Sequence, residues 1–420
     1  MKPKLSVILP NFNHADHLPK CVEAILSQSF TDLELVAVDD GSTDSSRDVL
    51  ASYARGDSRV RVFHNPKNLG VIATLNRALE LSRADYVFGA ASDDYVLPGY
   101  FRQAMELFAA HPQAGLATGL AECVNQYGQL KIRTPGYWSD EPTYLAPRDL
   151  APRMTLCGVP GPTIWRRDAF LAAGGYHADL RWHGDWFPLQ VVAFRHGVCF
   201  IPEPTSYVRE VDDSYSANQT RKKTQRLVLQ KLLSRMADPA YRDVLWGFGE
   251  SGILRQFGPE VVRAAATFPN LPDALLPALR ESTLINGSNL LHEPNDEVNA
   301  GLVALLARYG AESFPLYDAL CHVERSAAAT ATREAARGAC RELRRSVSLS
   351  RYWGSRAYRA MVMFARGMDR AMRPLHNRRL ERIEKHLEEL IRLQQHAIAE
   401  SARAASGTSP SARPASRMAA

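Results

Sequence analysis

The stretch Leu5-Ser-Val-Ile-Leu-Pro-Asn-Phe-Asn13 decides the fold, together with Val36-Ala-Val-Asp-Asp-Gly-Ser-Thr-Asp44 and Ser92-Asp-Asp94. The first two stretches are apolar runs that end in polar residues, and the third follows another apolar run, as expected where buried parallel strands meet solvent. Helical patterns separate the runs, so we predict an α/β protein with a mostly parallel sheet covered on both faces. Because ligands bind at the carboxyl edge of such sheets, these polar residues are expected to converge on one crevice.

The same alternation of short apolar runs and helical periodicity continues through the first 200 residues. We predict strands over 5–9, 33–38, 60–63, 86–88, 115–119 and 198–201, and helices over 18–28, 72–81, 98–110, 169–173 and 188–195. Another helix follows the 36–44 turn, where Ser42, Thr43 or Asp44 can act as N-cap. Residues 125–162 are rich in Pro, Gly, Tyr and Trp, and we expect loops and short antiparallel strands there that recognise an acceptor.

The chain is long enough for one large domain and a second region. It has 420 residues, of which 45% are hydrophobic and 23% are charged. The pattern is helical from about 220 to 345 and shows no readable chemistry. We therefore expect a sheet domain over 1–217, a helical domain over 218–345, a basic amphipathic helix with a short coiled coil over 346–400, and a disordered tail over 401–420.

Composition also bears on the compartment in which the protein works. No run of about 18 apolar residues is present, so no membrane-spanning helix is expected. The apolar run before Pro10 is too short for a secretory signal. The six cysteines form no close pair and no metal-ligand spacing, which indicates reduced thiols. We therefore expect a cytoplasmic protein.

The basic charge of the chain is concentrated near its C-terminus. Residues 341–382 hold twelve Arg, no Lys and three acids, a net charge of +9, so the remainder of this +6 chain carries about −3. An Arg-rich helix within 352–373 would lie on an anionic membrane surface at the inner face of the cell membrane, or dock on the helical domain. Apolar spacing over 380–398 suggests self-association through a short coiled coil. No nucleic-acid-binding module is recognisable.

The loop after the first strand argues against two large nucleotide-binding classes. A dinucleotide-binding Rossmann unit has a Gly-rich turn there, whereas this chain has Pro10-Asn-Phe-Asn13, and a Gly-Lys-Ser/Thr P-loop is absent from the sequence. An acidic crevice that holds a phosphate-bearing ligand needs a divalent cation between the two. Asp93 and Asp94 offer the hard oxygen ligands that Mg²⁺ or Mn²⁺ prefers. The sequence therefore suggests a nucleotide-sugar enzyme.

Several motifs together resemble the GT-A glycosyltransferases of family 2. They are Ser6–Asn13, the Asp39–Asp44 turn, Asn68-Leu-Gly70 with Asn76, Ser92-Asp-Asp94 at the place of the family's Asp-x-Asp metal motif, and Gly174-Gly-Tyr176 before His183-Gly-Asp185-Trp186. The resemblance covers about residues 4–215. It implies a GT-A (Rossmann-like) nucleotide-sugar domain with a mostly parallel sheet, followed by an α-helical C-terminal region, in a metal-dependent, hexosyltransferase-like enzyme.

The resemblance also implies how the donor is bound. Pro10 and Phe12 would line the base pocket, with the Phe12 ring as a stacking face, and Asn11 belongs to the nucleotide-sugar-binding residues. Asp40, with Asp39 beside it, would accept a hydrogen bond from the uracil imide or from a ribose hydroxyl. Asn68 and Asn76 belong to the same expected donor-binding set, with a helix-capping role as the alternative for either.

The resemblance assigns the chemistry to residues farther along the chain. Asp93 would reach the ribose, and Asp94 would hold the metal, Mn²⁺ or Mg²⁺, which neutralises the leaving diphosphate. Asp185 would act as general base on an acceptor hydroxyl, so that one in-line displacement inverts the anomeric configuration. Arg209 would close over the diphosphate. We expect a UDP-sugar as donor and a glycan or lipid-linked acceptor in cell-surface glycan or polysaccharide synthesis.

Three positions depart from the family pattern. Ala91 replaces the first carboxylate of the fuller metal motif, Gly184 stands where an acid often precedes the base, and Val211 replaces a histidine that often follows the arginine. These departures keep a rival open, namely a protein of the same fold that binds a nucleotide sugar without transferring it. A second rival is a sugar nucleotidyltransferase, which usually has a Gly-rich basic phosphate loop near its first strand.

Each of these residues also has a plain structural interpretation. Asp39 and Asp40 suit a turn and a helix cap, and Asp93 with Asp94 suits a solvated loop. Asp185 would then be a surface acid or an ion-pair partner. His183 is expected to be structural rather than a metal ligand.

Overall fold

The computed structural model describes residues 2–125, 130–133, 138–154, 158–159, 162–210, 222–268 and 270–282, together with Leu302 and Leu305. All of these belong to one compact unit, which extends from Met1 to Arg344. The predictions for 346–400 and 401–420 lie outside the described residues. They include the basic helix within 352–373 and the coiled coil over 380–398.

The N-terminal part alternates strand and helix as the apolar pattern predicts. Its elements are β1 (Leu5–Asn11), α1 (Leu18–Leu26), β2 (Leu33–Asp39), α2 (Ser46–Gly56), β3 (Val60–His64), α3 (Val71–Leu81) and β4 (Tyr86–Gly89). β2 pairs with both β1 and β3, and β1 also pairs with β4, all in parallel. The predicted α/β fold with parallel strands is therefore confirmed here.

The sheet is extended by strands from the second half of the domain, in the order β3-β2-β1-β4-β9-β6-β10-β5. β9 (Thr163–Arg166) lies antiparallel between β4 and β6 (Leu116–Asn125), and β6 pairs in parallel with β10 (Val198–Glu210). Because β9 is antiparallel to both β4 and β6, β6 and β10 run in the same direction as β1 to β4. Short strands β5 (Tyr95–Val96), β7 (Leu130–Arg133) and β8 (Thr143–Leu145) pair antiparallel with β10, β6 and β10.

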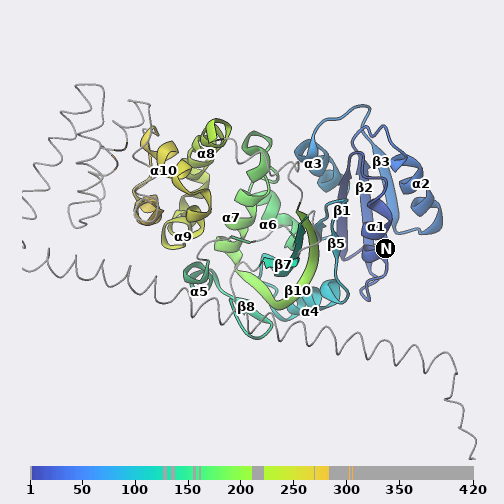
Figure 1. The fold of residues 1–420 in the computed structure, drawn as a ribbon. Coiled ribbons are helices and arrows are strands. Elements are labelled where there is room, and N and C mark those ends of the chain that lie inside the picture. Colours follow the sequence, from blue (N-terminus) through green and yellow to red (C-terminus); the bar gives the residue numbers. More distant parts are fainter. Residues whose placement is uncertain are drawn as a thin grey trace, which may run out of the picture. The chain divides into compact units, whose positions relative to one another are not determined.

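Helices cover both faces of the sheet. Successive side chains of a strand point to opposite faces, so both faces carry apolar side chains that the helices bury. Leu5, Val7 and Leu9 pack with α1, α2 and α4 (Tyr100–Ala110), whereas Ile8 packs on the other face with α3, α6 (Arg167–Ala172) and α7 (Trp186–His196). Figure 1 shows α1 and α2 beside β1, β2 and β3, with α6 and α7 nearer the centre.

A group of helices follows the sheet region. α8 (Lys222–Ala237), α9 (Leu245–Glu250) and α10 (Pro259–Ala266) share one hydrophobic core with α7 (Figure 1). Short α5 (Pro147–Leu150) also contacts α7. The helical pattern predicted from residue 220 onward is present as far as the structure describes it, while the boundary at 217 stays a prediction. Within the described residues, no helix has the length and apolar character needed to cross a membrane.

Candidate active site

The carboxyl ends of β1 and β2 meet in register, with Asn11 opposite Asp39. The Asn11 amide nitrogen lies 3.3 Å from Asp39 Oδ1 and 3.3 Å from Ser42 Oγ. The Asn11 amide oxygen is buried and has no hydrogen-bond partner among the described residues. The structure thus brings Asn11 and Asp39 together, as the sequence predicts, and leaves one buried acceptor at this edge.

The Asp39 carboxylate is buried and hydrogen bonded to the protein itself. The Ser42 backbone N–H donates to its Oδ2 at 3.2 Å, and the Arg47 guanidinium lies 2.9 Å from the same oxygen. Burial acts to raise the pKa of Asp39, but the hydrogen bonds from Ser42 and Arg47 outweigh it, so that pKa lies below its ordinary value. Asp39 is therefore a charged group built into the turn after β2.

The Asp40 carboxylate closes the loop that follows β3. Its oxygens accept hydrogen bonds from the backbone N–H groups of Leu69 and Gly70, each at 2.9 Å, and from the Asn65 amide at 2.7 Å. Gly41 has φ +76°, and a Cβ there would lie 2.7 Å from the Lys67 backbone. Glycine is required at this position because the turn packs directly on that loop.

Three predicted donor-site residues lie around this turn. Pro10 is half-buried in the last part of β1, and Phe12 is 40% exposed just beyond it. The ring of Phe12 is thus free to stack on a planar ligand. The side chain of Asn68 accepts a hydrogen bond from the Gly70 backbone N–H at 2.9 Å and so stabilises the loop. For Asn68, as for Asp39 and Asp40, the expected donor contact stays a prediction.

Asp93 and Asp94 follow β4 in a turn closed by a hydrogen bond of 3.2 Å from the Asp94 N–H to the Ala91 carbonyl. The Arg209 backbone N–H donates to Asp94 Oδ1 at 2.8 Å, which joins this turn to the end of β10. Burial, with a further contribution from the Asp93 charge, raises the pKa of Asp94 to about 7, although Arg209 acts in the opposite direction. Among the described residues, this one backbone N–H donates to Asp94, and the neighbouring Asp93 carboxylate accepts no hydrogen bond.

The predicted Arg209 lies beside this acidic pair. Its exposed guanidinium contacts His17 Nε2 at 2.5 Å, and His17 belongs to the loop that follows β1. In the same loop His14 Nδ1 lies 2.7 Å from Ser92 Oγ. Arg209 is therefore held by contacts to the loop after β1 and to the turn after β4. The two histidines were not recognised from the sequence.

The acidic pair fits a divalent cation that is shared with substrate. In the part of the chain that the structure describes, no three His, Cys, Asp or Glu side chains gather closely enough to hold a metal ion. Mg²⁺ and Mn²⁺ are, however, often held by one or two carboxylates, with phosphate and water oxygens completing the shell. Asp93 and Asp94 supply such a donor set, and a cation would also relieve their mutual repulsion.

Asp185 lies at the N-terminus of α7. Burial raises the pKa of Asp185 above its ordinary value. Burial also raises the pKa of the Tyr176 phenol, and the charge of Asp185 raises it further. The Asn76 amide donates to the Tyr176 carbonyl at 3.0 Å, and the Tyr176 hydroxyl packs on Gly89, at the end of β4. Tyr176 therefore links Asp185 to the strand that leads to the acidic pair.

The structure does not bring every predicted residue into direct contact. Within the described chain, Asp185 forms no hydrogen bond with Asp93 or Asp94. Asn76 contacts the segment before Asp185 rather than the turn at Asp40. The predicted site residues thus fall into two groups, one at the ends of β1, β2 and β4 and one at the start of α7.

Gly184, one of the departures from the family pattern, has a steric explanation. A Cβ at this position would lie 2.6 Å from the His177 carbonyl oxygen and 2.9 Å from that of Arg181. The same backbone is closed by a hydrogen bond of 3.0 Å from the His177 N–H to the Gly184 carbonyl. An acidic side chain before Asp185 would force this turn apart.

The segment before Asp185 is braced by α8, which showed no chemistry in the sequence. The Trp182 indole N–H donates to Gln225 Oε1 at 2.7 Å, and Gln225 Nε2 lies 3.1 Å from His183 Nε2. Burial lowers the pKa of His183 to about 4, so this histidine is neutral near pH 7, and its expected structural role stays a prediction. The sequence signal for Gln225 is that this polar residue stands on the buried face of α8.

Comparisons with known proteins agree with this architecture. Residues 6–170 match the family described as Glycosyl transferase family 2. The "Uncharacterized glycosyltransferase YibD" of Escherichia coli (strain K12) is 30% identical over 193 residues, which are 43% of this chain and 55% of that protein. The "Putative teichuronic acid biosynthesis glycosyltransferase TuaG" of Bacillus subtilis (strain 168) is 40% identical over 93 residues, 22% of this chain and 37% of that protein. The chain spans about half, or less, of the length of these two relatives.

A solved structure shows the same fold. The crystal structure of S. aureus TarS 1-349 in complex with UDP-GlcNAc has a TM-score of 0.51 to this chain at 14% identity, over 83% of this chain and 93% of that chain. The fold is therefore that of the GT-A proteins. The match over residues 6–170 and these relatives support a glycosyltransferase of family 2.

Proposed function

We propose that the protein is an inverting, metal-dependent glycosyltransferase that moves a sugar from a nucleotide-diphosphate donor, a UDP-sugar, to an acceptor hydroxyl. The observation that carries this proposal is the pair Asp93 and Asp94 at the carboxyl edge of the sheet. The partly buried Asp94 has a pKa raised to about 7 and accepts a hydrogen bond from the Arg209 backbone N–H. Strongly shifted carboxyl groups at a sheet edge are typical of functional sites.

The donor would bind across the ends of β1, β2 and β4. Phe12 offers its exposed ring to the base, and the unpartnered Asn11 amide oxygen is a ready acceptor for a ligand hydroxyl or N–H. Mn²⁺ or Mg²⁺ held by Asp94, with Asp93 beside it, would neutralise the charge that develops on the leaving diphosphate. Arg209 is close enough to this turn to contact the diphosphate from the other side.

Asp185 would act as the general base. Its carboxylate takes the proton from the acceptor hydroxyl while that oxygen bonds to the anomeric carbon, and the bond from that carbon to the diphosphate oxygen breaks with its electron pair. Attack opposite the leaving group inverts the anomeric configuration. The burial that raises the pKa of Asp185 makes it a stronger base than an exposed carboxylate.

The acceptor class and the compartment are part of the proposal. The names of relatives such as TuaG and the "Chondroitin synthase" of Escherichia coli support a role in cell-surface glycan or polysaccharide synthesis. A lipid-linked glycan is a suitable acceptor. Buried thiols such as those of Cys21 and Cys199 favour the reducing cytoplasm, and we propose peripheral contact at the inner membrane face.

The experiment that tests this function compares turnover of UDP-sugars by the wild type and by Asp185→Asn with Mn²⁺ present. A thermal-shift screen of nucleotide sugars selects the donor. We expect turnover to fall by about 10²- to 10⁴-fold in the variant, since it loses a general base, while UDP binding is kept. Asp48→Asn, on the exposed side of α2, is the matched control and should retain activity.

Two outcomes would favour the rival functions. A wild type that binds UDP but is as idle as Asp185→Asn would be a nucleotide-sugar-binding protein of the same fold. Release of pyrophosphate from a nucleoside triphosphate would indicate a sugar nucleotidyltransferase instead.

A further inference from the structure

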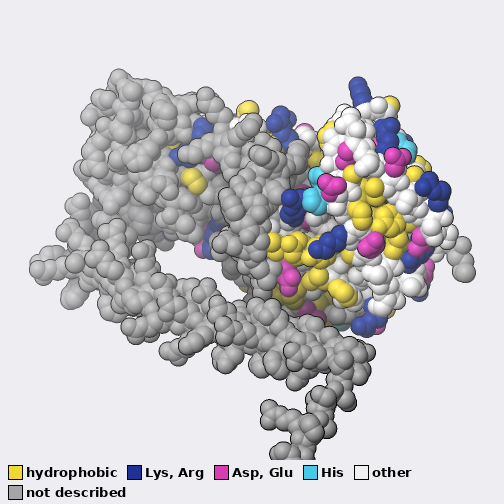
Figure 2. Space-filling model, turned by 45° about the vertical axis from the view of Figure 1, so that its right-hand side comes forward, with side chains coloured by type: hydrophobic (Ala, Val, Ile, Leu, Met, Phe, Trp, Pro, Cys, Tyr) yellow, Lys and Arg dark blue, Asp and Glu magenta, His cyan; other side chains and the backbone are white. Residues whose placement is uncertain are grey.

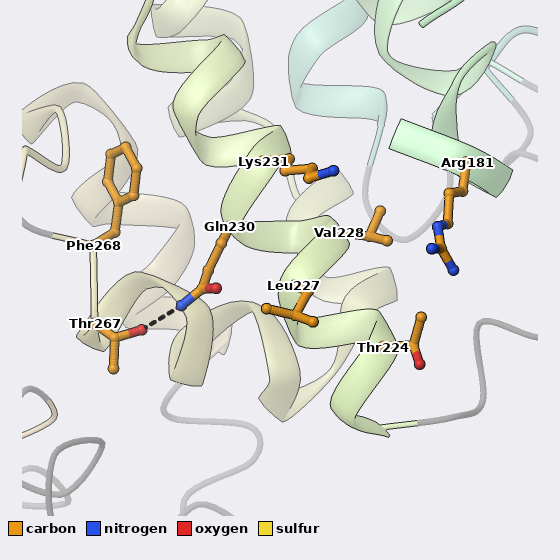
Figure 3. Close-up of a pocket in the computed structure, with 8 residues that line it drawn as sticks. All are labelled: Arg181, Thr224, Leu227, Val228, Gln230, Lys231, Thr267 and Phe268. Carbon is orange, nitrogen blue, oxygen red and sulfur yellow. Dashed lines mark hydrogen bonds between the residues drawn. The ribbon is translucent and has the colours of Figure 1, made fainter. Parts of the chain in front are cut away.

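A groove of about 400 Å³ lies between α8 and the end of α10, beside the segment that leads to Asp185. Figure 3 shows Arg181 at one end of this groove, Thr267 and Phe268 at the other, and Leu227, Val228 and Lys231 of α8 between them. The lining thus combines two cationic side chains with apolar ones. None of these residues takes part in the donor site described above.

Among the residues that the structure describes, the two cations of the groove have no carboxylate partners. Two arginines of α8 that point elsewhere are paired, Arg226 with Glu260 and Arg235 with Asp179, each at 3.2 Å. Arg181 and Lys231, by contrast, form no ion pair within the described residues, and both are exposed. A groove with two unpaired positive charges is complementary to an anionic ligand.

The backbone at Arg181 is held in an unusual conformation. Its φ of 51° and ψ of −120° fall in a region that non-glycine residues rarely adopt. Such strain persists where the surroundings impose it, often at ligand-binding positions. Here the Asp179–Arg235 ion pair and the contacts of Trp182 with Gln225 fix the residues on either side.

The groove is also connected to the predicted base. Arg181 precedes Asp185 by four residues, and Gln225, which follows the groove residue Thr224, contacts both Trp182 and His183. A ligand bound in the groove would therefore lie against the segment that positions Asp185. This is where the units of an acceptor next to the reacting hydroxyl would be expected.

The remaining lining suits a sugar. Leu227 is 61% exposed and gives an apolar surface for the C–H face of a sugar ring, while Phe268 offers an aromatic ring. The Thr224 hydroxyl and the Gln230 amide are available polar groups, and the Gln230 amide nitrogen already donates to Thr267 Oγ1 at 2.8 Å. Apolar walls with a few polar groups are typical of small-ligand sites.

We propose that this groove binds an acidic unit of the acceptor glycan, with its carboxylate or phosphate held by Arg181 and Lys231. The proposal rests on the function proposed above, because it names the acceptor class of that enzyme. It predicts that acidic glycans bind this chain more tightly than neutral glycans of the same size, and that salt weakens the binding.

Isothermal titration of the full chain at low salt tests the proposal with three probes: tetragalacturonate, glucose 6-phosphate and neutral maltotetraose. We expect at least one acidic probe to bind more tightly than maltotetraose, and its Kd to rise about tenfold or more in the double variant Arg181→Gln with Lys231→Gln. The matched control is Lys4→Gln with Arg55→Gln, two exposed cations outside the groove, which should leave the Kd unchanged. Preference for tetragalacturonate would identify a carboxylate unit, and preference for glucose 6-phosphate a phosphate unit.

The proposal is overturned if no acidic probe binds better than maltotetraose, or if the groove variant and the control bind alike. UDP binding in the presence of Mn²⁺, measured on the same samples, separates this outcome from failure of the proposed function. Intact UDP binding with no acidic preference removes only the groove proposal. Loss of UDP binding in the wild type would remove the proposed function, whatever the groove binds.

Discussion

Two pairs of aspartates lie at or just after the carboxyl ends of strands of the same sheet, and they differ in how many hydrogen bonds they accept from the protein. Asp39 and Asp40, after β2, accept hydrogen bonds from Ser42, from Arg47 and from the loop that follows β3. Asp93 and Asp94, after β4, receive one backbone donor, from Arg209, at Asp94. The pKa of Asp39 is accordingly lowered against the effect of burial, whereas burial raises that of Asp94 to about 7.

The contrast distinguishes Asp39 and Asp40, which stabilise the turns around the site, from Asp93 and Asp94, which we propose bind a ligand. The charges at Asp39 and Asp40 are compensated inside the protein, so they stabilise the fold. The charge at Asp94 is poorly compensated, so it costs stability in the metal-free protein, and the cation proposed above would offset this cost. Figure 2 shows that acidic and basic side chains are interspersed on the visible face of the described residues, so an uncompensated pair is a local feature and does not reflect an acidic surface.

The largest expected effect on stability comes from breaking the first pair at Asp40. Asp40→Ala leaves two backbone N–H groups and the Asn65 amide without their acceptor, and we expect the free energy of unfolding to fall by about 3 kcal/mol. Urea unfolding measures this loss. Asp93→Ala is the control from the other pair, and an equal loss there would show that the two pairs do not differ.

The next effect concerns ligand binding by the second pair. Asp94→Asn removes the charge that is proposed to hold Mn²⁺, so we expect the affinity for UDP with Mn²⁺ to fall by about 30-fold or more. Titration calorimetry with and without EDTA measures it. Wild-type affinity that is the same with and without the chelator would contradict the role given to Asp94.

The same variant should have a smaller, opposite effect on the metal-free protein. Because the pKa of Asp94 is raised, the folded state binds the proton more tightly than the unfolded state, and stability falls as the pH rises from about 4 to about 7. At pH 8 in EDTA, Asp94→Asn should therefore be more stable than wild type by about 1–2 kcal/mol, less than the full shift implies because water screens a partly exposed group. At pH 4 the difference should vanish, and a variant that loses stability at pH 8 would refute the interpretation.

The smallest effect is expected at Arg47, which is half-exposed beside the buried Asp39. Arg47→Gln should lower the free energy of unfolding by about 1 kcal/mol near pH 7. Since the pKa of Asp39 is lowered, this stabilisation is present above the ordinary aspartate pKa and is lost as the pH falls below it. Unfolding at pH 7 and pH 3 checks the sign, and an effect that grows at pH 3 would be inconsistent with it.

The local parts of the fold were predictable from the sequence. Apolar runs with polar ends marked β1, β2 and β4, and the predicted bounds lie within a few residues of those observed. The antiparallel insertion of β9 between β4 and β6 was not predicted, because pairing between distant segments has no local sequence signal. The same limit applies to the turn at Gly184, where tertiary packing alone forbids a side chain.

The sequence predicts which residues form the candidate site, but it does not predict the burial and the hydrogen-bond partners of each of them. Asp39 and Asp94 have the same chemistry in the sequence, and their opposite pKa shifts come from Arg47 and Ser42 on one side and from burial on the other. Gln225 was missed because its role depends on Trp182 and His183, more than 40 residues away in the chain. Such contacts exist only once the chain has folded.

The most direct test measures the stability of Asp39→Asn and Asp94→Asn side by side, by urea unfolding at pH 8 in EDTA. We predict opposite signs, with Asp39→Asn less stable than the wild type and Asp94→Asn as stable or more stable. Equal losses in both variants would show that the second pair is part of the fold like the first, and would contradict a carboxylate reserved for a bound cation.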